Sequence, residues 1–169
     1  KVYGEANPTL TFQYSGWKNT DSETVLDTRP TAATTATLTT PVGVHTNAIT
    51  VAGGADNNYN FTYVPADMTV TKAMLTVNAD AKTKVYGAAN PTLTYQYSGW
   101  KNNETETVLA TKPTASTTID VTTPVGVHTN AITVTGAVDE NYDFTYVPAN
   151  LTVTQATLTV TADAQTKVY

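Results

Sequence analysis

The stretch ADMTVTKAMLTVNAD, residues 66–80, contains two β-strand patterns that are out of phase with each other. Apolar side chains stand at even positions up to Val70 and at odd positions from Leu75 onward. Successive side chains of a strand point to opposite faces of a sheet, so a shift of one residue moves the whole apolar set to the other face. One strand therefore ends near Lys72, and the next strand faces a different core.

The stretch recurs because the whole chain repeats itself every 83 residues. A shift of 83 positions aligns residues 1–83 with residues 84–166 without a gap, and 61 of the 83 pairs are identical. This period is too long for one coil of a solenoid and suits a small domain. The sequence therefore predicts small domains in tandem.

The phase change sets the expected domain boundaries, which we place after Lys72 and after Gln155. Residues 73–155 then form a complete repeat unit. Residues 1–72 form a repeat unit that lacks its first strand, and residues 156–169 are the first strand and the start of a third unit.

The joint between repeat units is expected to be stiff. Residues 66–86 contain neither Gly nor Pro, whereas flexible linkers are rich in Gly and Ser and extended spacers are rich in Pro. The segment instead indicates nearly continuous strand. The residues that we assign to the inter-repeat joint are Lys72, Ala73, Met74, Asp80, Gln155, Ala156 and Asp163.

The composition favours an all-β fold. The chain of 169 residues holds 38 threonines, and these suit a pleated, half-buried sheet better than a helix. Several short strands separated by turn signals suggest small Ig-like β-sandwiches in an elongated rod, with a β-grasp-like sheet as the alternative. In the complete unit we expect strands near 74–79, 83–86, 92–98, 106–110, 117–121, 127–135, 143–147 and 150–155.

Charge and residue types exclude several function classes. The net charge of −5 argues against nucleic acid or an anionic membrane as the main partner, because both attract basic surfaces. The absence of cysteine excludes disulfide bonds and thiolate metal sites. The chain has no long apolar run of the kind that predicts a membrane-spanning helix. We also expect no cofactor.

The sequence predicts that the chain is not an enzyme. One histidine occurs in each repeat, at His45 and His128, so a single unit cannot build a metal site from several histidines. No serine stands in a G-x-S-x-G motif, which leaves a triad of Ser98, Asp120 and His128 without a supporting signature.

Three motifs carry a resemblance to a known family: KVYGAANPTLTYQYSGW at residues 84–100, VGVHTNAITVTGA at 125–137 and FTYVPANLTVT at 144–154. Over essentially its whole length, the chain resembles the MBG-type tandem repeat domains of large bacterial surface and adhesin-like proteins. The resemblance implies an extracellular, non-enzymatic, all-β stalk or adhesion module. It supplies no ligand and no binding residues.

Two functions are consistent with these features. The leading hypothesis is a structural stalk or filament repeat, which projects or links other parts of a bacterial cell-surface protein through a stiff array. The alternative is a multivalent adhesin module, in which each repeat binds a glycan or a host or matrix protein weakly and repetition gives avidity. Trp17 and Trp100 are the candidate ligand-stacking residues; packing against the sheet or the joint is the other interpretation.

The acidic turn GAVDENYD, residues 136–143, offers Asp139, Glu140 and Asp143 as calcium candidates. Calcium takes about six to eight oxygen ligands, and carboxylates supply them readily. Asp and Asn also form turns without a metal, by bonding their own backbone. Both interpretations stay open from the sequence.

The expected partners are adjacent repeats of the same chain. The two ends of the chain also match each other, because residues 1–72 lack a first strand and residues 156–169 supply one. Strand addition between copies would therefore join them head-to-tail into a fibre. The other interpretation is that the sequence is a segment of a longer continuous chain.

Overall fold

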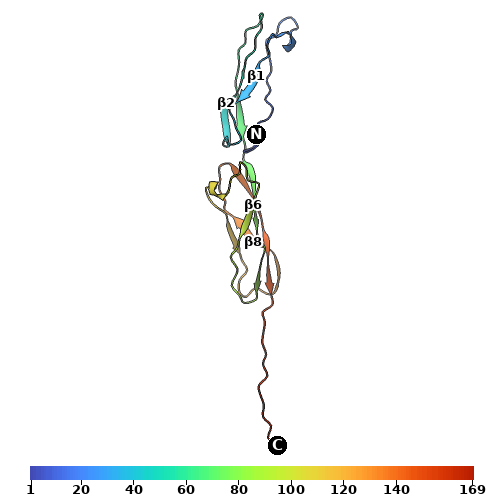
Figure 1. Ribbon diagram of the computed structural model, residues 1–169, viewed down its shortest axis with the longest axis vertical. Helices are drawn as coiled ribbons and strands as arrows, with labels where there is room; N and C mark the ends of the chain where they lie inside the picture. The colour runs from blue at the N-terminus through green and yellow to red at the C-terminus, as the bar shows by residue number, and fades with distance from the viewer. The chain divides into compact units, whose positions relative to one another are not determined.

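A computed structural model describes residues 1–169 and consists of β-strands joined by turns and loops (Figure 1). It contains no α-helix, and the all-β fold predicted from the composition is confirmed. The strands are β1 (Thr31–Thr34), β2 (Gly43–Ala52), β3 (Ala66–Val70), β4 (Ala73–Ala79), β5 (Lys82–Val85), β6 (Tyr95–Ser98), β7 (Thr114–Thr117), β8 (Gly126–Thr135), β9 (Tyr142–Val147) and β10 (Ala149–Thr154). Two short 3-10 turns are η1 (Glu23–Val25) and η2 (Glu106–Val108).

The chain divides into two compact units that do not coincide with the sequence repeats. The first unit comprises Lys1–Leu75, Gly99–Lys112 and Ala137–Phe144. The second unit comprises Thr76–Ser98, Pro113–Gly136 and Thr145–Tyr169. Three segments of the repeat unit expected at residues 73–155 therefore belong to the first compact unit: 73–75, 99–112 and 137–144. The repeat boundaries drawn from the sequence stay a prediction.

The first unit contains an antiparallel sheet with the strand order β1-β2-β3 (Figure 1). Thr31 of β1 lies opposite Ala52 of β2, and Gly43 of β2 lies opposite Val70 of β3. Met68 and Val70 of β3 are buried, whereas the residues that alternate with them are exposed. The even-numbered apolar positions before the phase change thus form the inward face of β3.

The second unit contains a four-stranded sheet with the order β5-β10-β8-β7. β5 runs parallel to β10, whereas β8 is antiparallel to both of its neighbours. Ile132 of β8 packs with Leu151 and Val153 of β10, and none of the three side chains is more than 1% exposed. This cluster is the core of the second unit.

A third sheet has the order β6-β4-β9, so β4 is its central strand. Both β4 and β9 contribute residues to each compact unit. Within the second unit, Val77 of β4 lies opposite Tyr97 of β6, and Ala79 of β4 packs against the cluster that contains Ile132. The two sheets of the second repeat therefore share a core, as in a β-sandwich. The β-grasp-like alternative requires a helix, which the fold does not contain.

Two of the strands expected from the sequence are wrong: one is a 3-10 turn, and the other lies at earlier residues. The turn η2 replaces the strand expected over residues 106–110, and the backbone N–H of Val108 closes it with a 3.1 Å hydrogen bond. The strand expected over residues 117–121 lies earlier, as β7. Asp120 accounts for the shift, because its Oδ1 accepts the backbone N–H of Thr122 at 2.9 Å and forms a turn there.

Equivalent core positions in the two repeats are predicted to differ in their contribution to stability. Ile132 is fully buried, whereas Ile49, which stands 83 residues earlier, is partly exposed. We expect Ile132→Ala to lower the free energy of unfolding of its unit by about 2–5 kcal/mol, the range for fully buried positions. We expect Ile49→Ala to cost less. Native-state hydrogen exchange of the amides in β8 and β2 measures both losses, and equal losses would contradict the prediction.

Candidate functional site

The first unit contains a cluster of three aromatic rings around one carboxylate, which we call the junction cluster: Tyr3, Trp100, Glu104 and Tyr142. The Tyr142 hydroxyl donates to Glu104 Oε2 at 2.6 Å, and the Tyr3 hydroxyl donates to Glu104 Oε1 at 2.5 Å. Tyr142 also packs edge-to-face against Tyr3, with ring centroids 5.8 Å apart, and against Trp100, at 5.4 Å. Tyr142 is 1% exposed and Tyr3 is 4% exposed, so the cluster is closed to solvent at its centre.

Local turn chemistry places Tyr142 at the start of β9. Asp139 Oδ1 accepts the backbone N–H groups of Asn141 and Tyr142, at 2.7 and 3.1 Å, which forms an Asx turn. The Asn141 carbonyl in turn accepts the backbone N–H of Ala73 at 2.9 Å. Asn141 Oδ1 accepts the backbone N–H of Val42 at 3.0 Å. The turn before Tyr142 is therefore hydrogen-bonded to residues on both sides of the first phase change.

Burial and the shared carboxylate shift the ionisation of both phenols in the same direction. Burial raises the pKa of Tyr142, and the hydrogen bond to Glu104 raises it further. The pKa of Tyr3 is raised by the same two causes, in the same order. Because each phenol donates a hydrogen bond to Glu104, the cluster keeps these hydrogen bonds only while both phenols remain neutral.

Two ion pairs lie at the edge of the junction cluster. Lys101 Nζ pairs with Glu5, and this hydrogen bond lowers the pKa of the Glu5 carboxyl. Lys72 Nζ donates to the Asp139 carbonyl at 2.8 Å and lies 3.7 Å from Asp143 Oδ1. Because the four side chains of these pairs are 30–64% exposed to solvent, the pairs orient the loops more than they stabilise the fold.

The first unit also contains an open groove of about 410 Å³, which lies between residues 11–17 and 59–64. Ile49 and Val51 of β2 contribute to its lining. Trp17 is also part of the lining, with its ring 5.1 Å from that of Tyr14 and 5.2 Å from that of Tyr59. We call this feature the first-repeat groove.

The first-repeat groove occupies the place that β4 fills in the second repeat. Its walls, residues 12–15 and 59–64, stand 83 residues before β6 and β9, and β4 lies between those two strands. In the first repeat no strand lies between the walls, and neither wall is itself a strand. The groove therefore lies where the repeat alignment places the first strand of a repeat.

Glycine contacts and burial agree with this assignment. A Cβ atom on Gly99 would lie 2.8 Å from the carbonyl oxygen of Met74 in β4, whereas a Cβ atom on the equivalent Gly16 would meet nothing within 4 Å. Val134 of β8 is 2% exposed, whereas the equivalent Val51 is only partly buried. The same residue types thus become buried where the strand is present.

The two tryptophans predicted as ligand-stacking candidates are half-buried and pack on tyrosines. Trp100 lies against Tyr142 in the junction cluster. Trp17 lies against Tyr14 and Tyr59 and forms part of the wall of the first-repeat groove. The structure therefore brings the two residues into equivalent positions but leaves an open groove beside Trp17 alone.

The residues assigned to the joint fall into two groups. Around the first phase change, Lys72 and Ala73 bond to the Asn141 turn as described, Met74 is exposed, and Asp80 Oδ2 accepts the Thr94 hydroxyl at 2.5 Å. Around the second, the joint residues are exposed and form no strand: Gln155, Ala156 and Asp163.

The three carboxylates considered as calcium ligands do not form one site, because each has a different environment. Asp139 caps its own turn, Asp143 lies beside Lys72, and Glu140 is exposed. No group of three His, Cys, Asp or Glu side chains gathers within metal-binding range. The arrangement of these acids therefore supports no metal proposal.

The residues considered for catalysis have structural partners. Nε2 of His45 lies 2.9 Å from the Pro41 carbonyl, and Nε2 of His128 lies 2.9 Å from the Pro124 carbonyl. The Asp120 carboxylate accepts hydrogen bonds from the residues that follow it, and these lower its pKa. Each of these three side chains forms a hydrogen bond within its own local turn.

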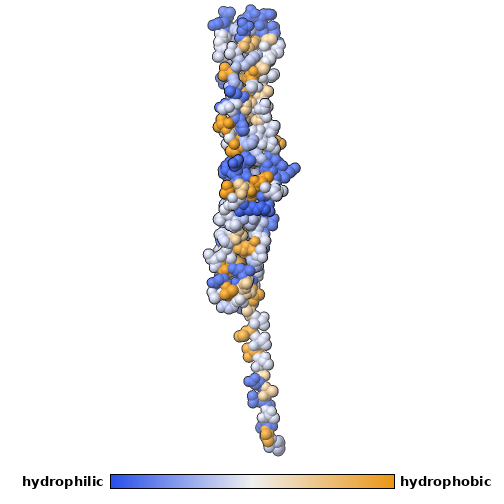
Figure 2. Space-filling model, turned by 90° about the vertical axis from the view of Figure 1, so that its left-hand side faces the viewer, coloured by the Kyte–Doolittle hydropathy of each residue, from blue (hydrophilic) through white to orange (hydrophobic).

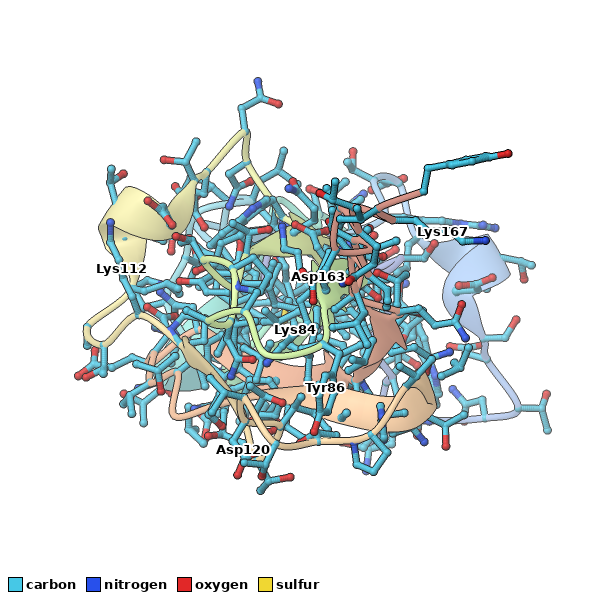
Figure 3. All side chains as sticks on the ribbon, turned by 90° about the horizontal axis from the view of Figure 1, so that it is seen from below. Lys84, Tyr86, Lys112, Asp120, Asp163 and Lys167 are labelled. Carbon is cyan, nitrogen blue, oxygen red and sulfur yellow. The ribbon has the colours of Figure 1, made fainter.

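Sequence reasoning missed the roles of Glu104 and of Lys84. Lys84 is 5% exposed, and its Nζ donates to Asn90 Oδ1 at 3.1 Å and to the Asp120 carbonyl at 2.6 Å (Figure 3). Lys1 makes the equivalent bond to a backbone carbonyl in the first repeat, also at 2.6 Å. The available signal was a lysine and an asparagine six residues apart at the same place in both repeats.

A model of the MBG domain (YGX type) family matches residues 1–69 and 75–152. These two tandem segments cover most of the chain, so the chain belongs to the MBG domain family, and the resemblance inferred from the sequence motifs is confirmed. MBG domains are repeat modules of surface proteins. Neither a curated protein nor a solved structure matches the chain. The chain forms no helix of the length and hydrophobicity that crossing a bilayer requires.

Because the pKa values of the two phenols are raised, we expect the first unit to lose stability at alkaline pH. The fold favours the neutral phenols, so their contribution is complete below the unfolded pKa of 10.0 and falls as the pH rises through the higher folded values. We expect Tyr142→Phe to cost about 1–3 kcal/mol near pH 8, because Glu104 loses a donor. The variant should then lose less stability than the wild type between about pH 8 and pH 11.

Urea denaturation at the two pH values measures this difference. Tyr86→Phe is the matched control, because Tyr86 stands 83 residues after Tyr3 but is 45% exposed. The control should behave as the wild type. If Tyr142→Phe loses as much free energy of unfolding between the two pH values as the wild type does, the junction cluster does not cause the pH dependence.

Proposed function

We propose that this MBG repeat chain is a structural stalk or filament module of an extracellular protein on a bacterial cell surface. Tandem repeats of this kind project or link other parts of the protein, and the module itself carries out no catalysis. Its function is mechanical: a complete repeat buries its own sheet faces, and the joint between repeats resists bending. The partners are adjacent repeats, and the net charge of −5 argues against nucleic acid and membrane as partners.

The observation that supports this proposal is the junction cluster, because its residues come from both sequence repeats. Tyr3 and Glu5 belong to the first repeat, and they bind Glu104 and Lys101 of the second repeat. A hydrogen bond to a charged, partly buried acceptor contributes about 1.5–3 kcal/mol, more than an ordinary one. Bending at this joint would have to break such bonds and expose buried rings.

The backbone at the joint supports the same proposal. Only two residues separate the end of β3 at Val70 from the start of β4 at Ala73, and neither is Gly or Pro. Ala73 is fully buried, and its N–H is bonded to the Asn141 carbonyl. A short connection whose backbone groups are already bonded has little conformational freedom.

A multivalent adhesin module is the second candidate function, and the exposed groove beside Trp17 favours it. An aromatic-lined groove of about 410 Å³ falls within the size range of sites for small ligands. A glycan or a host or matrix protein is the ligand class that this candidate requires. However, the equivalent position in the second repeat is filled by β4, which argues against one such site in every repeat.

Joint stiffness is testable by spin labelling, because the chain has no cysteine and labels can be placed at will. With labels at Thr46→Cys and Glu140→Cys, exposed positions of the two repeats within the first unit, we expect a narrow distance distribution from pulsed electron paramagnetic resonance. Thr71→Gly should broaden it by freeing the backbone at the joint. Thr154→Gly, the equivalent change outside the labelled span, should leave it narrow. A broad distribution in the unsubstituted joint would contradict the stalk proposal.

A glycan array decides between the stalk and the adhesin. The stalk proposal predicts no specific binding by the wild-type chain. The adhesin predicts binding that Trp17→Ala and Trp100→Ala both reduce, since one site per repeat requires both. Binding with that pattern would replace the stalk by the adhesin as the better account.

A further inference from the structure

The second repeat holds an early and a late segment together through a parallel strand pair. β5 and β10 run side by side in the same direction, with Lys82 opposite Leu151 and Val85 opposite Thr154. β10 is also paired with β8, so it is an interior strand of its sheet. We propose that the pair β5–β10, which we call the parallel clamp, is the load-bearing element of the repeat and resists tension along the chain by shear.

The parallel clamp rests on the stalk function only for the source of the tension, because a stalk transmits pulling forces between the parts that it links. It is a load-bearing element inside a repeat, whereas the stalk proposal concerns bending at the joint between repeats. The two therefore fail separately. A flexible joint would leave the strength of the clamp unchanged, and a weak clamp would leave the joint stiff.

The direction of the two strands decides how the clamp is loaded. Tension pulls β5 toward its N-terminal end, through Ala81, and pulls β10 toward its C-terminal end, through Gln155. In a parallel pair these pulls act along the strands in opposite senses, so the strands separate only by sliding. The hydrogen bonds of a parallel pair are evenly spaced, and sliding strains them together. An antiparallel pair of such strands would instead be pulled apart from one end, bond by bond.

The segment that leads into the clamp is held in both sheets. Only Asp80 and Ala81 separate β4, in the three-stranded sheet, from β5, in the four-stranded sheet. The backbone N–H of Asp80 donates to the Thr94 carbonyl at 2.9 Å, so the connection itself is bonded. A short, bonded connection has little slack. Tension on the start of the repeat is therefore carried into β5.

One face of the clamp is buried and the other is exposed. Lys84 and Val153 lie opposite each other and are 5% and 1% exposed, whereas their neighbours Val85 and Thr154 are exposed. On the face drawn in Figure 2, exposed hydrophobic side chains are interspersed with hydrophilic ones. Water can therefore compete for the hydrogen bonds of the clamp from one side only, and the low dielectric on the buried side strengthens these bonds.

Lys84 fastens β5 to a further part of the second unit. Its Nζ donates to the Asp120 carbonyl at 2.6 Å and to Asn90 Oδ1 at 3.1 Å. Asn90 Nδ2 donates in turn to the Ile119 carbonyl at 2.5 Å. A buried ammonium group costs free energy unless it is well bonded, so these partners hold Lys84 firmly in place. Sliding of β5 has to break these bonds together with those of the strand pair.

The same parallel arrangement occurs in both repeats. The backbone N–H of Tyr86 donates to the Thr154 carbonyl at 2.9 Å, just beyond the end of β5. In the first repeat, Val2 lies opposite Thr71 in parallel, and the backbone N–H of Tyr3 donates to the Thr71 carbonyl at 2.8 Å. These residues stand 83 positions before their counterparts in the second repeat. The clamp is therefore a property of the repeat and not of one copy of it.

Single-molecule force spectroscopy of the full 169-residue chain tests the clamp, because the chain has no cysteine and handles can be attached at two introduced ones. In a shear geometry the handles pull on Ala81→Cys and Gln155→Cys, just before β5 and just after β10. In a peel geometry they pull on Tyr86→Cys and Gln155→Cys, which load the same pair from one end. All three positions are exposed. At equal loading rate, we expect the rupture force in shear to be at least about twice that in peel.

Lys84→Met tests the contribution of the buried lysine in the shear geometry. The substitution keeps a long apolar side chain but removes both hydrogen bonds of Nζ. We expect the rupture force to fall by at least about a quarter. Lys112→Met is the matched control, because Lys112 belongs to the first unit and its ion pair with Glu106 is exposed. The control should rupture at the force of the unsubstituted chain.

Tyr86→Pro tests the strand pair without relying on the buried lysine. Proline removes the N–H that donates to the Thr154 carbonyl. It otherwise suits the position, because the Ala88 N–H bonds to the Val85 carbonyl and Gly87 has a φ of 81°, the geometry of a type II turn that favours proline in second place. We therefore expect a folded chain whose rupture force in the shear geometry is lower.

Three outcomes would overturn the proposal. Equal rupture forces in shear and in peel would show that strand direction does not decide the strength of the pair. An unchanged shear force in both Lys84→Met and Tyr86→Pro would show that the bonds of the clamp carry no load. An equal fall in Lys84→Met and Lys112→Met would exclude Lys84 from the clamp. If Lys84→Met does not fold, the comparison of the two geometries and Tyr86→Pro still decide.

Discussion

The structure depends on the hydrogen bonding of one strand, the first strand of each repeat, at the centre of its sheet. In the second repeat this strand is β4, and it lies between β6 and β9. A central strand saturates the backbone groups of both neighbours, so its presence decides whether those neighbours are strands at all. Where it is present, Ile132 and Tyr142 are buried to 1% exposure or less. Where it is absent, the equivalent Ile49 and Tyr59 stay partly exposed.

The same strand also connects the repeats. β4 begins only two residues after β3 ends, and its first residue, Ala73, bonds to the turn that positions Tyr142. Tyr142 then shares Glu104 with Tyr3 from the preceding repeat. Completion of one repeat and attachment to the previous one are therefore parts of a single hydrogen-bonded arrangement.

Local patterns in the sequence predicted the all-β fold and the tandem organisation, because both rest on short-range alternation and an ungapped repeat. The change of phase between Val70 and Leu75 corresponds to the end of β3 and the start of β4. The turn η2 could not be predicted in this way, since it is only three residues long and contains Thr107 and Val108, residue types that favour strands. The role of Glu104 could not be predicted either, because its partner Tyr3 lies 101 residues away in the sequence.

The groove shows a different limit of sequence reasoning. The repeat alignment indicated that the first repeat lacked a strand, but not what the remaining residues would do. Only the structure shows that they line a groove, with Trp17 and Tyr14 packed along its wall.

The most direct measurement of the central claim is amide hydrogen exchange on a chain extended by its own missing strand. Residues 156–166 placed ahead of Lys1 recreate the sequence that already runs into Lys167. If the first strand completes each repeat, residues 12–15 and 59–64 will gain the protection of their equivalents in β6 and β9. The same extension with aspartate in place of its leucine and valine will leave them unprotected. Protection that stays unchanged on adding the natural strand would contradict the account.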